Sequence, residues 1–200
     1  MKKFVLIGMA MLLALMVQAQ DATKILDKSA ATLKSAGNVK IGFTIEVEGG
    51  SSNGYIKLQG QKFVINMGST ISWFDGKTMW TYVKANDEVN VTEPTANEVA
   101  KMNPYSFLSF YKNGYTAKMG TGTAKAYEVV LTSEEGNSFQ KVVIRVNKST
   151  YYPTSVRMIS AKGAETYIRC NSLLKNQRYK ASTFQFKEKD YPGVDVIDLR

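Results

Sequence analysis

The sequence predicts an α+β protein built on one large antiparallel sheet or open barrel, with a few short helices. Apolar residues alternate with polar ones from Val39 to Val47, which is the period-two pattern of a strand with one wet face. Further β-rich runs follow at short, regular intervals and are separated by turn residues. One amphipathic helical pattern precedes the first strand. A chain of 200 residues is long enough to bury a core of this kind.

Residues 1–19 have the features of a signal peptide. Lys2 and Lys3 precede the apolar run 4–17, and Val17-Gln18-Ala19 fits the small-x-small cleavage rule. The run is shorter than the roughly 20 residues of a membrane span, with an uncleaved anchor as the alternative. We therefore expect residues 1–19 to be cleaved and residues 20–200 to form a single exported domain.

The stretch Asp21–Ala36 is the predicted first helix. Its apolar face carries Ala22, Ile25, Leu26, Ser29, Leu33 and Ala36. Asp21 is the expected N-cap, and Gly37-Asn38 the expected C-cap. A helix that covers a sheet is favoured over a membrane-surface helix, because its lysines suit any solvated face.

An antiparallel meander is predicted from Val39 to Thr92, with its strongest signal at Asp75-Gly76. This dipeptide between β-branched and aromatic runs indicates a hairpin with a type I′ turn. Glu93–Ala100 is polar and is expected to end the meander. The other strands expected in this half are 55–59, 62–67, 71–74, 78–83 and 89–92, with turns at 49–54, 60–61 and 86–88.

Pro104 is expected to open a short helix that carries more large apolar residues than one face can bury. Either this helix is buried in a core, or some of its residues are solvated or border a cavity. The chain then returns to strands and closes with a turn and a short apolar tail at 191–198. The strands expected in this half are 126–132, 139–146, 154–160, 165–173 and 182–187.

The residues available for chemistry do not favour an enzyme. The chain has no histidine, which removes the commonest general base and metal ligand. The single Cys170 is expected to be a buried, inert thiol, and no catalytic residue, metal or cofactor is expected. The net charge of +9 is carried by scattered lysines without a recognition motif, so nucleic acid is not an expected partner.

The apolar face of the predicted sheet is the informative feature. A sheet roofed by few short helices can leave a cavity that suits acyl chains, and each buried methylene contributes roughly 0.8 kcal/mol. The alternative is that sheet and helices pack fully against each other. Strand parity and the Pro104 segment give the expected acyl-chain wall: Phe43, Ile45, Ile56, Leu58, Phe63, Ile65, Trp73, Trp80, Tyr82, Phe107, Leu108 and Tyr111.

The sequence resembles the LolA family of periplasmic carriers of outer-membrane lipoproteins. The resemblance rests on the helix followed by strand 39–47, on Asp75–Tyr82 with Glu88-Val89 beyond it, and on Asn103-Pro104 before an apolar helix. The closing motif also matches, in Phe184-Gln185-Phe186 and Pro192–Ile197. These places span nearly all of the chain after residue 19, and their order and spacing are more specific than any one of them.

The resemblance implies an incomplete, strongly curved antiparallel barrel closed by a helical lid. It implies a monomeric periplasmic carrier that takes a lipoprotein's acyl chains from an inner-membrane ABC exporter to an outer-membrane acceptor. The family often has an arginine on the strand 62–66 that bonds to the lid, whereas this chain has Val64 there. The alternatives are a carrier of another lipid and a lipid-sensing or adaptor module on the same scaffold.

Overall fold

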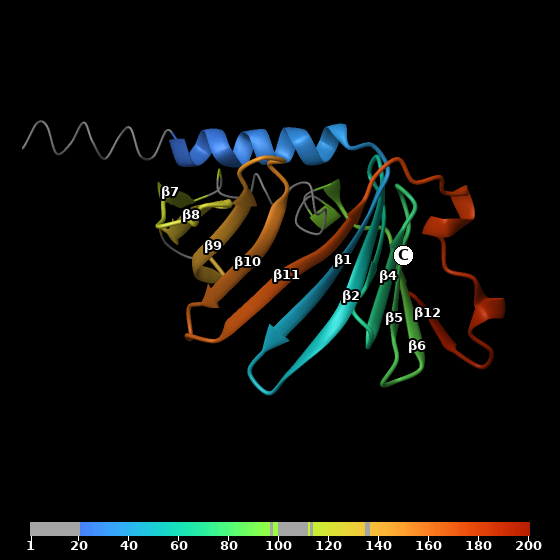
Figure 1. Cartoon of the computed structure of the whole chain (residues 1–200). Coiled ribbons are helices and arrows are strands. Elements are labelled where there is room, and N and C mark those ends of the chain that lie inside the picture. The colour runs from blue at the N-terminus through green and yellow to red at the C-terminus, as the bar shows by residue number, and fades with distance from the viewer. Residues whose placement is uncertain (1–20, 97, 100–111, 113, 135–136) are drawn as a thin grey trace, which may run out of the picture. The chain divides into compact units, whose positions relative to one another are not determined.

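The computed structural model describes residues 21–200 apart from 97, 100–111, 113 and 135–136 (Figure 1). Its strands belong to one 12-stranded sheet in the order β12-β6-β5-β4-β3-β2-β1-β11-β10-β9-β8-β7. The strands are β1 (Val39–Val47), β2 (Gly50–Gln59), β3 (Lys62–Asn66), β4 (Thr70–Phe74), β5 (Met79–Val83), β6 (Glu88–Thr92), β7 (Tyr115–Met119), β8 (Ala126–Ser133), β9 (Phe139–Asn147), β10 (Pro153–Ser160), β11 (Glu165–Leu174) and β12 (Asp195–Asp198). Among the described residues no ladder joins β12 to β7, so the sheet is open.

The predicted α+β class with an unclosed antiparallel sheet is confirmed. Helical structure in the described residues consists of the helix 21–35, the short 3-10 helices η2 (Ala181–Phe184) and η3 (Glu188–Asp190), and helical residues at 96, 98, 99 and 112. No helix in this described part is long and apolar enough to cross a membrane. The short helix expected from Pro104 lies outside the described residues.

Contacts divide the chain into two compact units, residues 1–33 with 108–167, and residues 34–107 with 168–200. The first unit contains most of the helix and the strands β7 to β10. The second contains β1 to β6, β12 and most of β11. The expected single domain over 20–200 stays a prediction.

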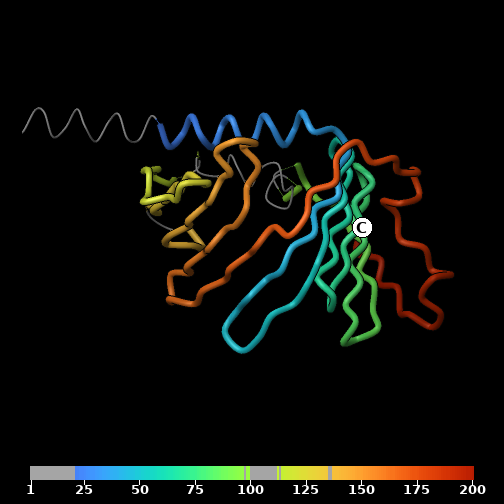
Figure 2. The backbone as a smooth tube through the Cα atoms, viewed as in Figure 1, coloured from blue at the N-terminus to red at the C-terminus, as the bar shows by residue number. Residues whose placement is uncertain are grey.

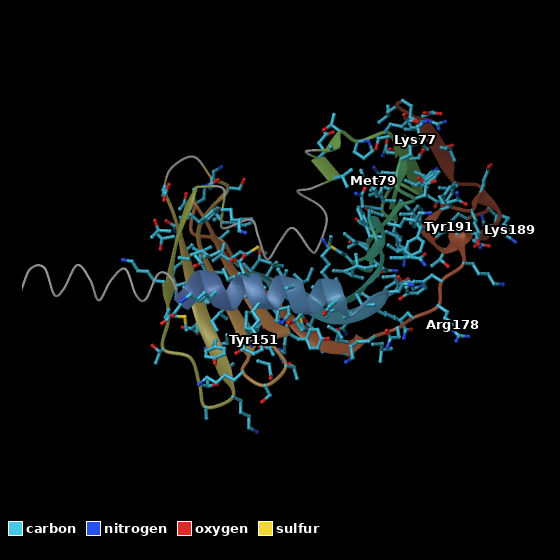
Figure 3. The ribbon with its side chains drawn as sticks, turned by 90° about the horizontal axis from the view of Figure 1, so that it is seen from above. Lys77, Met79, Tyr151, Arg178, Lys189 and Tyr191 are labelled. Carbon is cyan, nitrogen blue, oxygen red and sulfur yellow. The ribbon has the colours of Figure 1, made fainter. Side chains whose placement is uncertain are left out.

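In the first unit the helix packs by its predicted apolar face, since Ala22, Leu26, Ser29 and Leu33 are fully or almost fully buried. Lys28 on this helix places its Nζ 3.8 Å from the centre of the Tyr151 ring in the turn between β9 and β10 (Figure 3). Asp21 is itself helical, so the prediction that it caps the helix is wrong. Gly37, with φ +70°, ends the helix as predicted.

In the second unit the meander β1 to β6 has apolar side chains on both faces. Directly paired residues of antiparallel strands share a face, so the register defines the two sets. We call them the phenylalanine face and the tryptophan face. The phenylalanine face carries Val39, Ile41, Phe43, Ile45, Ile56, Leu58, Phe63, Ile65, Phe74 and Met79. The tryptophan face carries Tyr55, Val64, Ile71, Trp73, Trp80, Tyr82, Val89 and Val91.

The C-terminal segment 179–191 covers the tryptophan face (Figure 2). Phe184 is fully buried with Val64 and Trp73. The Tyr191 ring lies 5.8 Å from Trp73 and 4.8 Å from Tyr82, measured between ring centres. These rings close one face of the meander with a second aromatic core.

The predicted strand 182–187 is wrong, because residues 181–184 form η2 and the segment joins no ladder. Phe184 and Phe186 alternate as in a strand, but they pack their rings onto the face of the sheet instead of extending its edge. The apolar tail, in contrast, forms β12, which pairs in parallel with β6. A turn was predicted at 49–54, but β2 begins at Gly50 and pairs with β1 through that stretch.

The hairpin between β4 and β5 forms where it was predicted, but its turn is of another type. Gly76 has φ +104°, while Lys77 is not among the residues with positive φ. A type I′ turn needs positive φ at both central residues, so one positive φ at the first of them matches a type II′ turn. Asp75 stands before these residues, and its Oδ1 accepts hydrogen bonds from the backbone N–H groups of Lys77 and Thr78 at 3.0 and 2.9 Å.

Asp75→Ala is expected to lower the free energy of unfolding by about 1 kcal/mol at neutral pH, because two backbone N–H groups lose their acceptor. Burial alone raises the pKa of Asp75, but hydrogen bonds from Thr78 and Lys77 outweigh it. Gln185 and the charge of Lys62 add to this effect, so the pKa is lowered from 3.8. The stabilisation is thus present above pH 3.8 and is lost as the pH falls through the lowered value of the folded state.

Urea unfolding of both proteins as a function of pH measures this effect. The difference between wild type and Asp75→Ala should shrink in acid, whereas removal of the exposed carboxylate of Glu48 by Glu48→Ala should cost little at any pH. If the difference in unfolding free energy between wild type and Asp75→Ala did not change with pH, the proposed role of the Asp75 charge would be contradicted.

Gly54→Ala is expected to destabilise the second unit by about 1–3 kcal/mol. A Cβ there would overlap the carbonyl oxygen of Asn66 and would lie 2.5 Å from two atoms of the Phe43 ring. Gly50 offers a matched control, because a Cβ at Gly50 meets nothing within 4 Å. Equal denaturation midpoints for Gly54→Ala and Gly50→Ala would contradict this close approach.

Candidate functional site

The expected acyl-chain wall divides between the two faces of the meander. Six of its members share the phenylalanine face: Phe43, Ile45, Ile56, Leu58, Phe63 and Ile65. Trp73, Trp80 and Tyr82 lie on the tryptophan face, where the C-terminal segment packs on them. Phe107, Leu108 and Tyr111 lie outside the described residues. One wall therefore cannot contain the whole predicted set.

The register of β3 with β4 explains this division. Phe63 pairs with Phe74, and Val64 pairs with Trp73. Because Trp73 and Phe74 are neighbours in one strand, they point to opposite faces. The sequence has two large aromatic residues next to each other here, and the expected set included Trp73, which lies on the face opposite to Phe63 and Phe74.

The phenylalanine face is organised in rows that cross the strands. One row is Val39, Leu58, Phe63, Phe74, Met79 and Thr92, and its first four members are almost fully buried. The next row is Ile41, Ile56, Ile65, Ser72, Thr81 and Asn90. The second row is thus apolar over β1 to β3 and polar over β4 to β6.

Apolar surface becomes more accessible along β1 to β3 away from the buried row. Ile45, Ile56 and Ile65 are only half-buried. Val47 at the end of β1 is 50% exposed, and Met67 just after β3 is 42% exposed. The apolar face therefore extends past the core and offers surface that side chains of the described residues do not fully cover.

Sequence reasoning missed the polar part of the second row. The hydroxyl oxygens of Ser72 and Thr81 lie 3.3 Å apart, and Asn90 donates to Glu88 through Nδ2 at 2.8 Å. These groups border the apolar surface on the side of β4. The signal was present as polar residues at alternate positions of β4 and β5, but only the register shows that they continue the row of Ile56 and Ile65.

Cys170 points to the phenylalanine face. Its neighbours Arg169 and Asn171 contact Glu46 and Thr44, which lie on the other face, so the side chain between them points away. Burial raises the pKa of the thiol to about 11. A thiol with this pKa is protonated near neutral pH and is a poor nucleophile.

Val64 belongs to the tryptophan face and is almost fully buried there with Trp73 and Phe184. A side chain at this position therefore points away from the phenylalanine face. The position at which the resemblance leads us to expect an arginine is thus filled by an apolar side chain of the aromatic cluster.

A pocket of about 440 Å³ lies at the β6 end of the buried row. It is lined by Met79, Thr92, Glu93, Pro94, Glu98, Leu199 and Arg200. Lys77 forms an ion pair with Glu93 at 3.0 Å beside it (Figure 3). The lining mixes carboxylates, an arginine and apolar groups, and it brings together no pattern of catalytic residues.

Three comparisons place the chain among known proteins. No curated protein matches the sequence. In the fold comparison, an uncharacterised conserved protein from Thermus thermophilus has a TM-score of 0.59 at 12% identity, over 89% of this chain and 99% of that chain. A LolA-superfamily protein from Nitrosomonas europaea has a TM-score of 0.41 at 11% identity, over 84% and 98% of the two chains. MucB of Pseudomonas aeruginosa, in its complex with MucA, has a TM-score of 0.48 at 14% identity, over 84% and 62%.

The family comparison is more specific than these distant likenesses of fold. The model of the outer membrane lipoprotein carrier protein LolA matches residues 12–162, which is more than half of the chain. The matched stretch includes the helix and β1 to β6 with their phenylalanine face. The chain therefore belongs to the family of the outer membrane lipoprotein carrier protein LolA.

Proposed function

We propose that this protein is a periplasmic carrier that holds the acyl chains of lipoproteins on its phenylalanine face. The observation that carries the proposal is the apolar surface of Ile45, Ile56 and Ile65, which continues from a buried core toward water. Membership of the LolA family supports this cargo. An inner-membrane ABC exporter as donor and an outer-membrane acceptor are part of the same proposal.

The energetics of such binding are sufficient without a catalytic group. About ten methylenes that leave water contribute ~8 kcal/mol before the cost of ordering the chain. This is near the free energy of micromolar binding. A carrier needs this range, because its cargo must leave again at the acceptor.

The polar part of the second row, Ser72, Thr81 and Asn90, would orient the bound lipid on this face. An acyl chain that lies over Ile56 and Ile65 reaches Ser72 and Thr81 in the neighbouring strands. Hydroxyl groups at this border suit the ester and glyceryl oxygens that join the acyl chains to a lipoprotein. The apolar end of the cargo then lies on the β1 to β3 side, and its polar end lies toward β4 and β5.

Ile65→Glu is expected to reduce the bound acyl chain at least about tenfold while the protein stays folded, because a carboxylate on this surface opposes hydrocarbon. Mass spectrometry of lipid that co-purifies with the protein measures the loading, and circular dichroism with urea unfolding reports the fold. Ile197→Glu in β12 is the matched control, since Ile197 is 39% exposed and lies far along the sheet order from β1 to β3.

Full loading of a folded Ile65→Glu protein would show that the phenylalanine face is not the site. Loss of the fold in Ile65→Glu, with Ile197→Glu intact, would show a solid core in place of a binding surface.

Cys170 is expected to report on occupancy of this face. With a pKa of about 11, its thiolate fraction is roughly a hundredfold below that of a free cysteine at mild pH. Alkylation by iodoacetamide should therefore be slow in the folded protein, fast in urea, and about tenfold faster for each unit of pH up to the pKa. Bound acyl chain should slow it further. A rate equal to that of the unfolded chain would contradict the burial.

A further inference from the structure

The tryptophan face carries a row of cations at one end of the meander. Lys40 in β1 pairs directly with Lys57 in β2. Both Nζ atoms lie near the Tyr55 ring, 5.0 and 5.3 Å from its centre. Like charges at directly opposed positions of a sheet are destabilising, so the fold itself gains little from placing these two lysines together.

The chain that follows β11 also carries cations, and it lies beside the start of β1. Gln177 donates its backbone N–H to the Asn38 carbonyl at 2.9 Å, and Ser172 lies beside Gly42. Lys175 lies between these two contacts along the chain. The stretch of chain that carries Lys175 therefore runs beside the start of β1, the strand that carries Lys40.

Two more cations occur in this segment. The Tyr179 hydroxyl donates to the Val39 carbonyl at 3.0 Å, which holds the segment against the start of β1. Arg178 and Lys180 flank this tyrosine, and Figure 3 shows Arg178 on the outer side of the segment. We call Lys40, Lys57, Lys175, Arg178 and Lys180 the lysine patch.

The stretches of chain that build the lysine patch contain no acidic residue. Residues 31–45, 49–74 and 166–187 include no aspartate and no glutamate. The carboxylate of Asp75, which follows the second stretch, is already engaged by Lys77, Thr78 and Gln185. The lysine patch therefore contributes five positive charges, and acidic residues follow only at the ends of these stretches, at Glu46, Asp75 and Glu188.

An exposed apolar side chain adjoins the lysine patch. Leu174 is 50% exposed and directly precedes Lys175. Tyr55 and Tyr179 are half-buried, with apolar rings and polar tips. Lysines, tyrosines and an exposed leucine together suit the interface of an anionic bilayer, where cations meet phosphates and apolar groups enter the headgroup layer.

We propose that the lysine patch with Leu174 docks the protein onto a bilayer that contains anionic phospholipid. An acidic protein partner would account for the cations but not for the exposed side chain of Leu174. The bilayer accounts for both and is therefore the favoured partner. This docking goes beyond the carrier function, because it uses the face of the meander opposite to the phenylalanine face. The protein can rest on a membrane while the acyl-chain surface stays free to receive or release cargo.

The test is sedimentation of the purified protein with vesicles of phosphatidylglycerol and phosphatidylethanolamine, and with vesicles of phosphatidylcholine alone. Binding to the anionic vesicles is expected, with little binding to the zwitterionic ones. Lys40→Gln with Lys57→Gln should weaken binding about 30-fold, since each lysine near an anionic surface contributes about fivefold. Lys118→Gln with Lys141→Gln, two exposed lysines of β7 and β9, is the charge-matched control and should change binding little.

Leu174→Ser separates apolar contact from charge. It should weaken the binding that remains at high salt, whereas the lysine substitutions should act mainly at low salt. Leu199→Ser is its control, because Leu199 is 61% exposed but lies beside β6.

Three results would overturn the proposal: equal binding to both kinds of vesicle, equal losses in the two double variants, or binding to polyglutamate without binding to vesicles. The last would assign the lysine patch to an acidic protein. The vesicles contain no lipoprotein, so failure here leaves the acyl-chain measurement on Ile65→Glu unaffected.

Discussion

The register between β3 and β4 is the constraint on which the second unit depends. It pairs Phe63 with Phe74 and Val64 with Trp73, and so places large apolar groups on both faces of the same two strands. A sheet that is apolar on one face needs one covering layer, and this meander needs two. Val64 and Trp73 lie on one face and Phe63 lies on the other. All three can be buried only if each face packs against a covering layer of its own.

The C-terminal segment meets that need on the tryptophan face. Phe184 fills the centre of the aromatic cluster, and Tyr191 closes its outer part against Trp73 and Tyr82. This cover comes from the same chain, and it occupies the tryptophan face where these rings lie. The phenylalanine face carries the half-buried and exposed apolar residues, which is why we propose it as the acyl-chain surface.

Local patterns predicted the elements well, and long-range pairing limited the prediction of the site. The strand Val39–Val47 was predicted with the bounds that it has in the structure, because strict alternation of apolar and polar residues is a property of the strand itself. The face on which Trp73 lies could not be predicted from its own strand, since it depends on how β4 pairs with β3 across a turn. The segment 182–187 has strand-like alternation but packs face-on, and the parallel pairing of β12 with β6 joins residues about a hundred positions apart. No window of sequence contains that information.

The polar part of the second row also limits how much apolar surface is exposed on the phenylalanine face. Ile56 and Ile65 continue in the same row as Ser72, Thr81 and Asn90, so the apolar patch ends at β3 and does not cross the whole meander. A larger patch would bind hydrocarbon more tightly, but it would also favour association between copies of the protein. The carrier that we propose has to accept and release its cargo, and both requirements favour a patch of bounded width. The change from isoleucine in β2 and β3 to hydroxyl side chains in β4 and β5 sets that width.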